Sequence, residues 1–138
     1  MARSIGAIAA GLVVVGIVVA GIQYATSLLY PLPEGLDPFD PASGEALRAH
    51  AEGLPTTAWL LAFGSEIIGV FLGALAAGTV AGSRKSMFAG VIVAVGVVGS
   101  VMNWVSFAHP LWYIVGQLVG YPLIFFAVSR VLAGRRGA

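Results

Sequence analysis

Four strongly hydrogen-bonding side chains lie inside stretches of sequence that are otherwise apolar. They are one carboxyl group and three amides, Glu66, Gln23, Asn103 and Gln117. A carboxyl group among amides can exchange a proton, attract a cation or form neutral hydrogen bonds. Ionisable groups inside a membrane are costly and commonly mark functional sites, so Glu66 is the first candidate for any chemistry.

The residues that follow Glu66 predict that its side chain faces a neighbouring helix. Positions i, i+3, i+4 and i+7 share one face of a helix, and Glu66 shares its face with Gly69, Gly73 and Ala77. Small residues at this spacing let two helix backbones approach closely. We therefore expect this face to pack against another helix and to carry Glu66 inward.

Two further pairs of glycines predict helix packing elsewhere in the chain. Gly96 and Gly99 share a face with Asn103, and Gly116 and Gly120 are spaced four residues apart around Gln117. Each amide is therefore expected to face the interior of a helical bundle.

The depth of the four polar groups predicts that they meet. At about 1.5 Å per residue, the three amides lie roughly 10 Å below one boundary and Glu66 about 15 Å below it. All three tryptophans and all four tyrosines occur in that same half of the apolar stretches, which favours an outward-facing pocket or a partner surface there. The candidate ligand-binding or proton-site residues are Glu66, Gln23, Asn103, Gln117, Tyr113 and Tyr121.

The elements that must position these residues are transmembrane helices. The chain of 138 residues is 59% hydrophobic and only 9% charged, a composition typical of membrane proteins. A span needs about 20 apolar residues, and the predicted spans are 5–30, 56–82, 87–108 and 111–129. We expect an all-α, four-helix transmembrane bundle forming a single domain over 1–138. The alternative for the first span is a cleaved signal sequence, although its apolar run exceeds the usual length of about 7 to 15 residues.

The distribution of basic residues predicts the orientation of the spans. Lysine and arginine in short loops stay on the cytoplasmic side. One face of the membrane carries Arg3, Arg84, Lys85, Arg130, Arg135 and Arg136, and the other carries only Arg48. We therefore expect both termini in the cytoplasm of a bacterial inner membrane and residues 31–55 as the one long outer loop. In that loop Asp40 can cap a short surface helix that starts at Pro41 and ends before Gly53.

Several functional classes have no support in the sequence. There is no cysteine, and the formal net charge of +1 with scattered cations does not favour nucleic acid. The two histidines have no close ligand partner, so no metal site or cofactor is predicted. No hydrolase motif or paired-carboxylate arrangement is present, so an enzymatic function is not favoured.

Two motifs resemble those of a known family. The segments YPLPEGLDPFDP at 30–41 and HPLW at 109–112, with Asn103 and Pro122, resemble a widespread family of small uncharacterised bacterial four-span membrane proteins. The resemblance implies the topology and no particular activity. It also implies a departure, because relatives carry an acid where this chain has Gln23 and an aromatic residue near the position of Glu66.

Two functional interpretations remain open. In the first, the protein is a binding or accessory component whose pocket holds a small apolar or cationic ligand, a membrane lipid or a larger membrane partner. Its small-residue helix faces could then also pack against a second copy to form a homo-oligomer. In the second, it is a minimal proton-coupled carrier of a small cationic or polar solute that uses Glu66, by analogy with small four-span transporters. An ionised Glu66 costs about 2.5 to 3.5 kcal/mol at a helix centre, so we expect it to be neutral at rest. A hydrogen bond from a neutral Glu66 would contribute only about 0.6 kcal/mol on average to stability. A stabilising role alone is therefore a weak explanation for a glutamate at this position.

Overall fold

The computed structural model describes residues 2–38 and 40–134 and places most of them in helices. The elements are α1 (Ala2–Leu29), the 3₁₀ helix η1 (Pro41–Ser43), α2 (Gly44–Glu52), α3 (Thr56–Ala81), α4 (Lys85–Ser106) and α5 (Leu111–Gly134). The helices α1, α3, α4 and α5 are each long and apolar enough to cross a membrane. The structure thus confirms the predicted all-α, four-helix bundle, and the protein is an integral membrane protein.

Prolines and glycines set the limits of the helices. Pro55 adopts an extended conformation before the first residue of α3, and Gly82 ends that helix with φ of 75°, a value that favours glycine. Asp40 caps the 3₁₀ helix η1, since its Oδ1 accepts a hydrogen bond from the Ala42 N–H at 2.9 Å. The last helix continues through Pro122 and Arg130 to Gly134, about one turn beyond the predicted end of the span.

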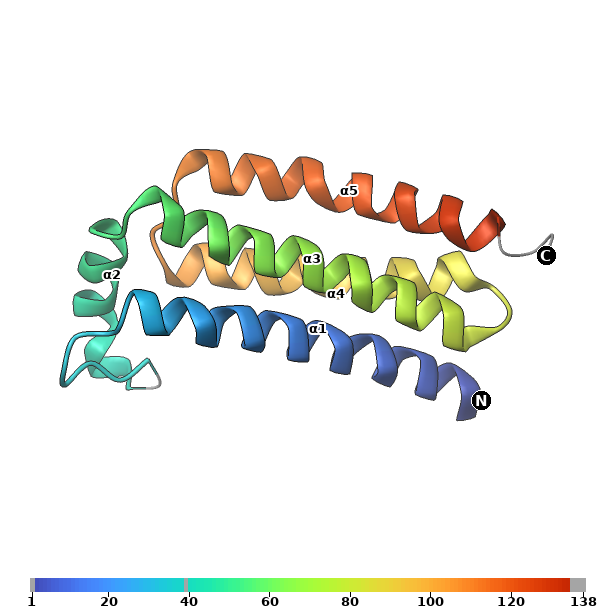
Figure 1. Cartoon of the computed structure of the whole chain (residues 1–138), viewed down its shortest axis with the longest axis horizontal. Helices are drawn as coiled ribbons and strands as arrows, with labels where there is room; N and C mark the ends of the chain where they lie inside the picture. The colour runs from blue at the N-terminus through green and yellow to red at the C-terminus, as the bar shows by residue number, and fades with distance from the viewer. Residues whose placement is uncertain (1, 39, 135–138) are drawn as a thin grey trace.

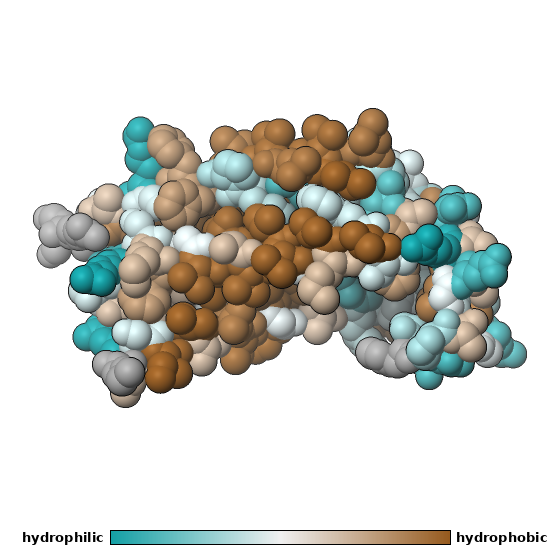
Figure 2. Space-filling view, turned by 180° about the vertical axis from the view of Figure 1, so that it is seen from behind, coloured by the Kyte–Doolittle hydropathy of each residue, from teal (hydrophilic) through white to brown (hydrophobic). Residues whose placement is uncertain are grey.

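The four long helices run side by side with α3 in the centre (Figure 1). Helix α3 packs against α1, α4 and α5, whereas α1 packs mainly on α3 and to a smaller extent on α4. The first residues of α1 and the last residues of α5 lie at the same end of the bundle, which we call the termini end. Helix α2 lies across the opposite end, which we call the loop end. On the face shown in Figure 2, apolar residues form a belt across the middle of the bundle, with hydrophilic residues toward both ends.

The contact between α1 and α3 depends on glycine. A Cβ atom at Gly73 would lie 2.7 Å from the Gly11 carbonyl oxygen, and one at Gly69 would lie 2.8 Å from Val19 Cγ2. A Cβ atom at Gly11 would lie 2.9 Å from Ala77 Cβ. The face that carries Gly69, Gly73 and Ala77 is therefore the face on which α1 packs, and the two backbones approach closely there.

Arginines secure neighbouring helices at both ends of the bundle. Arg3 Nε donates to the Val80 carbonyl oxygen at 3.0 Å at the termini end. At the loop end, Arg48 Nη2 donates to the Val105 carbonyl at 3.0 Å and its Nε donates to the Ser106 carbonyl at 3.2 Å. Each guanidinium satisfies carbonyls at a helix C-terminus, where a cation is favoured. The predicted basic residues Arg135 and Arg136 lie outside the described residues.

Candidate functional site

Glu66 is the centre of a hydrogen-bond network that joins α3, α4 and α5. Its Oε2 accepts a hydrogen bond from Ser100 Oγ at 3.2 Å and another from Gln117 Nε2. Its Oε1 accepts one from Asn103 Nδ2 at 3.3 Å. The structure therefore brings together three of the four polar side chains that the sequence places in the spans, and the donors all approach from α4 and α5.

The orientation of Gln117 is fixed by Trp104. The indole Nε1 of Trp104 donates to Gln117 Oε1 at 2.7 Å. Because an indole N–H can only donate, Gln117 must present its oxygen to Trp104 and its amino group to Glu66. Gln117 is completely buried, so this amide forms a fixed link whose donor end points at the carboxyl group.

Ser100 is a member of the network that our sequence analysis did not select. Its hydroxyl lies 2.5 Å from the hydroxyl of Tyr121, and both side chains are buried. Ser100 precedes Asn103 by three residues and follows Gly96 by four, so helical periodicity could have placed it on the same face. A lone serine in an apolar helix is a weak signal, since its hydroxyl is often satisfied by the helix backbone.

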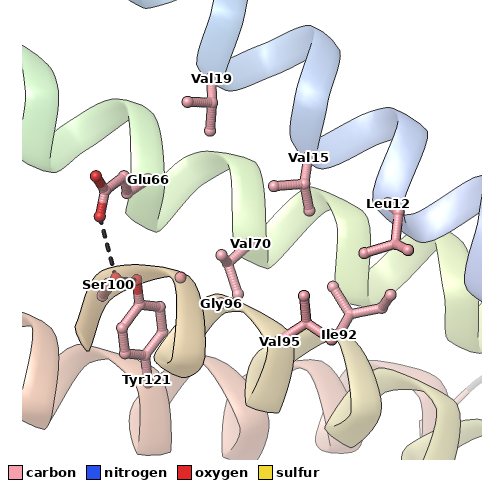
Figure 3. A pocket seen from close by; sticks show the side chains of 11 residues that line it. Leu12, Val15, Val19, Glu66, Val70, Ile92, Val95, Gly96, Ser100 and Tyr121 are labelled. Carbon is pink, nitrogen blue, oxygen red and sulfur yellow. Dashed lines mark hydrogen bonds between the residues drawn. The ribbon is translucent and has the colours of Figure 1, made fainter. Parts of the chain in front are cut away.

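A groove adjoins the network on the side of α1. It has a volume of ≈ 280 Å³ and lies between α1, α3 and α4, with Glu66, Ser100 and Tyr121 at its polar edge (Figure 3). The remaining side chains that line it are apolar: Leu12, Val15, Val19, Val70, Ile92 and Val95. Two of these, Leu12 and Val95, are 41% and 47% exposed. Because the spans face lipid, the groove opens sideways toward the acyl chains.

Gly96 and Gly99 of α4 have different surroundings. A Cβ atom at Gly96 would lie 2.8 Å from Val70 Cγ2, so this glycine packs against α3. Gly99 also borders the groove, but a Cβ atom there would meet nothing within 4 Å. The expectation that Gly99 packs against a helix does not hold, because the limited contact between α1 and α4 leaves space beside it.

Gly116 and Gly120 of α5 lie against α3. A Cβ atom at Gly116 would lie 2.9 Å from Phe63 Cε2, and one at Gly120 would lie 2.8 Å from Ile67 Cδ1. These close approaches place α5 where Gln117 and Tyr121 reach the network.

Gln23 does not join the other three polar groups. A hollow of ≈ 230 Å³ lies beside α1 and the first turns of α3, and Gln23 lines it together with Ala58 and Ala62. The side chain of Gln23 is exposed, and none of the hydrogen bonds to Glu66 in the described part of the chain comes from it. The expectation that all four groups meet therefore does not hold, because the Gln23 side chain lies on an exposed part of α1 and lines a separate hollow.

Tyr113 belongs to an aromatic cluster behind the network and does not line the groove. It is buried, and its ring centroid lies between 4.9 and 5.8 Å from those of Trp59, Phe63, His109 and Trp112. Its phenol also interacts with Glu66. Tyr113 therefore closes the loop side of the network, and Tyr121 is the tyrosine that a ligand in the groove could reach.

His109 lies in the aromatic cluster and, among the described residues, is not part of a metal site. The His109 Nδ1 lies 2.9 Å from the Phe107 carbonyl oxygen, and its ring packs on Trp59 and Tyr113. Over residues 2–38 and 40–134, no group of three or more metal-ligating side chains occurs. The site therefore consists of one carboxyl group, its neutral donors and an apolar groove.

Comparisons with known proteins add no relative to this description. No protein-family model, no curated protein and no solved structure matches the chain. The family resemblance of the YPLPEGLDPFDP and HPLW segments stays a prediction. Any function must therefore be inferred from the geometry around Glu66.

Proposed function

We propose that this integral membrane protein is a small binding or accessory component that holds an amphipathic membrane molecule in the groove between α1 and α4. The polar end of that molecule would lie at Glu66 and its apolar part along the aliphatic side chains. The observation that supports this proposal most directly is the position of Glu66. Its carboxyl group lies between a buried network and a groove that opens to lipid.

The groove has the chemical composition of a small-molecule site. Such sites are mostly apolar with a few convergent polar groups, and their volumes start at about 300 Å³. This groove has a volume of ≈ 280 Å³ and one polar edge, so it would suit a small head group and the first part of a hydrocarbon chain. The rest of the chain would remain among the lipids.

The network supports binding because it holds the carboxyl group in place before a ligand arrives. Its three donors come from two other helices. A group held in this way loses little conformational freedom on binding, which favours affinity.

The groove can be tested by filling it. Gly99→Leu adds a side chain in open space at the groove, and Gly16→Leu adds the same side chain in open space on the exposed surface of α1. We expect native mass spectrometry from detergent to detect one saturably bound dodecan-1-ol or dodecylamine per wild-type chain. Binding should be lost in Gly99→Leu and kept in Gly16→Leu. Equal binding of both probes to both variants would refute a ligand site in the groove.

A proton-coupled carrier of a small cationic or polar solute is the second candidate, because Glu66 is the one acidic residue within the four spans. A carrier should show proton-driven uptake in reconstituted vesicles that Glu66→Gln abolishes while the helical circular dichroism signal is kept. Uptake that is unchanged by Glu66→Gln would contradict this candidate. A bacterial inner-membrane location, cytoplasmic termini and a homo-oligomeric or larger assembly remain predictions from the sequence.

A further inference from the structure

We infer that the molecule taken up by the groove carries a protonated amine, so that the ligand is a cationic amphiphile whose ammonium group pairs with Glu66. This inference rests on the proposed function, since it concerns the same groove. It adds the charge and the donor chemistry of the ligand.

The first argument is the balance of donors and acceptors at the carboxyl group. Ser100, Asn103 and Gln117 all donate to Glu66, so the protein presents an acceptor to the groove. A carboxylate has about four lone-pair positions on its two oxygens. In its ionised form Glu66 offers only acceptors, so a ligand with N–H or O–H donors suits it better than a ligand that only accepts.

The second argument is charge. The three donors are an alcohol and two amides, which stabilise a carboxylate without neutralising it. Among the described residues that line the groove there is no lysine, arginine or histidine. An ionised carboxyl group near the middle of a membrane remains costly until a cation approaches it. A cationic ligand would supply the positive charge that no described side chain lining the groove provides.

The cations of the protein are held elsewhere. Arg3 and Arg48 bond to carbonyls at the two ends of the bundle, and the Arg130 guanidinium lies 4.7 Å from the centre of the Phe126 ring. Arg84 and Lys85 lie at the start of α4 at the termini end. The described cations are thus placed at the boundaries of the apolar belt, away from the groove.

The third argument is the direction from which Glu66 can be approached. All three donors come from α4 and α5, while the facing side chains of α1 are apolar: Val19, Val15 and Leu12. Figure 3 shows Glu66 beside this open space, with Val19 across it and Ser100 on the opposite side. An ammonium group that enters between α1 and α4 would reach the carboxyl group without displacing a protein donor, and its alkyl chain would contact the valines.

These arguments rank ligands of equal chain length by head group. A protonated amine supplies charge and donors, an alcohol supplies one neutral donor, and a carboxylate is repelled. Hydrogen bonds to charged groups contribute more than neutral ones, so we expect dodecylamine to bind about tenfold more tightly than dodecan-1-ol. Dodecanoate should show no binding in the groove.

The experiment measures these three probes against wild-type protein, Glu66→Gln, Glu66→Asp and Gly99→Leu by native mass spectrometry at neutral pH. Glu66→Gln should lower the affinity for dodecylamine to that for dodecan-1-ol. Glu66→Asp should keep the preference for the amine. Glu45→Gln, which removes a carboxyl group from α2 at the loop end, is the control and should bind like wild type. Circular dichroism establishes that each variant is folded, and the wild-type ranking tests the inference even if a variant is not.

The outcomes separate this inference from the proposed function. Equal binding of amine and alcohol, both abolished by Gly99→Leu, would overturn the cationic ligand and leave the groove as a site. A preference for the amine that persists in folded Glu66→Gln would also overturn it, because the charge would then be recognised elsewhere. If no probe responds to Gly99→Leu, the proposed function itself fails.

Discussion

The two halves of the bundle are held together by different interactions. The half toward the termini end contains the continuous apolar core, including Ala74, Ala77, Ala89, Ile92 and Val128. The half toward the loop end contains the side-chain network of Glu66, the aromatic cluster and the hollow at Gln23, and the groove extends from Glu66 toward Leu12 and Ile92 at the edge of the core. One half is closely packed by small and aliphatic residues, and the other joins its helices through polar groups and leaves space.

This difference indicates how stability and function are divided in a small membrane protein. Lipid offers no hydrophobic driving force between helices, so close packing of small residues must hold them together. Where that packing is complete, there is no room for a ligand. Where it leaves space, beside Gln23 and beside Gly99, polar groups become accessible. The closely packed half can therefore stabilise a fold whose other half retains a costly carboxyl group.

The largest expected effect tests the closely packed half. In Gly73→Ala the new Cβ atom would lie 2.7 Å from the Gly11 carbonyl oxygen, so α1 must move. We expect a loss of about 2 to 3 kcal/mol in the free energy of unfolding, as for overpacked cores, measured by denaturant titration in mixed micelles. Gly64→Ala in the same helix is the control, because a Cβ atom there meets nothing within 4 Å. It should be neutral or stabilising by up to about 1 kcal/mol. Equal destabilisation by both variants would contradict the packing argument.

The next effect compares two glutamines. Gln117→Leu leaves the Trp104 indole without a partner and removes one of the two hydrogen bonds to Glu66 Oε2, so we expect a loss of about 1 to 2 kcal/mol. Gln23→Leu removes an exposed amide and should change stability by less than about 0.5 kcal/mol. The same titration measures both, with the blue shift of tryptophan emission as a second readout. A larger loss for Gln23→Leu would reverse our assignment of the two amides.

A smaller effect is expected at the loop end. Arg48→Ala removes two hydrogen bonds to the last carbonyls of α4, with a cost of about 1 kcal/mol. Hydrogen exchange should become faster in α2 and in the last turn of α4, and protection in α3 should be unchanged. Arg48→Lys should lie between wild type and Arg48→Ala, since it keeps the charge without the fork of donors. Unchanged exchange in α2 would show that its position does not depend on this contact.

The smallest expected effect is a gain in stability. Ser129 Oγ is buried and, within the described chain, makes no hydrogen bond. Ser129→Ala should therefore stabilise the protein by roughly 0.5 kcal/mol, the difference in helix propensity between the two residues. Ser106→Ala is the comparison, because Ser106 Oγ donates to the Met102 carbonyl at 2.9 Å and is exposed. A clear destabilisation by Ser129→Ala would indicate that the hydroxyl has a partner in the membrane.

Much of the candidate site could be predicted from local periodicity. Asn103 and Gln117 were expected to reach Glu66, and both donate to it. The prediction failed for Gln23 and did not include Ser100. Periodicity gives the face on which a residue lies, but it does not say whether the neighbouring helix is still in contact at that depth.

The sequence by itself determined the class of protein, the number of spans and the small-residue face of α3. These follow from the length of apolar runs and from the spacing of glycines, which are local properties of the chain. Only the tertiary structure decided that α3 is the central helix, that Gln23 lines a hollow away from Glu66, and that Glu66 borders a groove between α1 and α4. Such features depend on how far four helices remain in contact along their length. That distance is set by the fit of all their side chains together, because interiors pack closely only where shapes match.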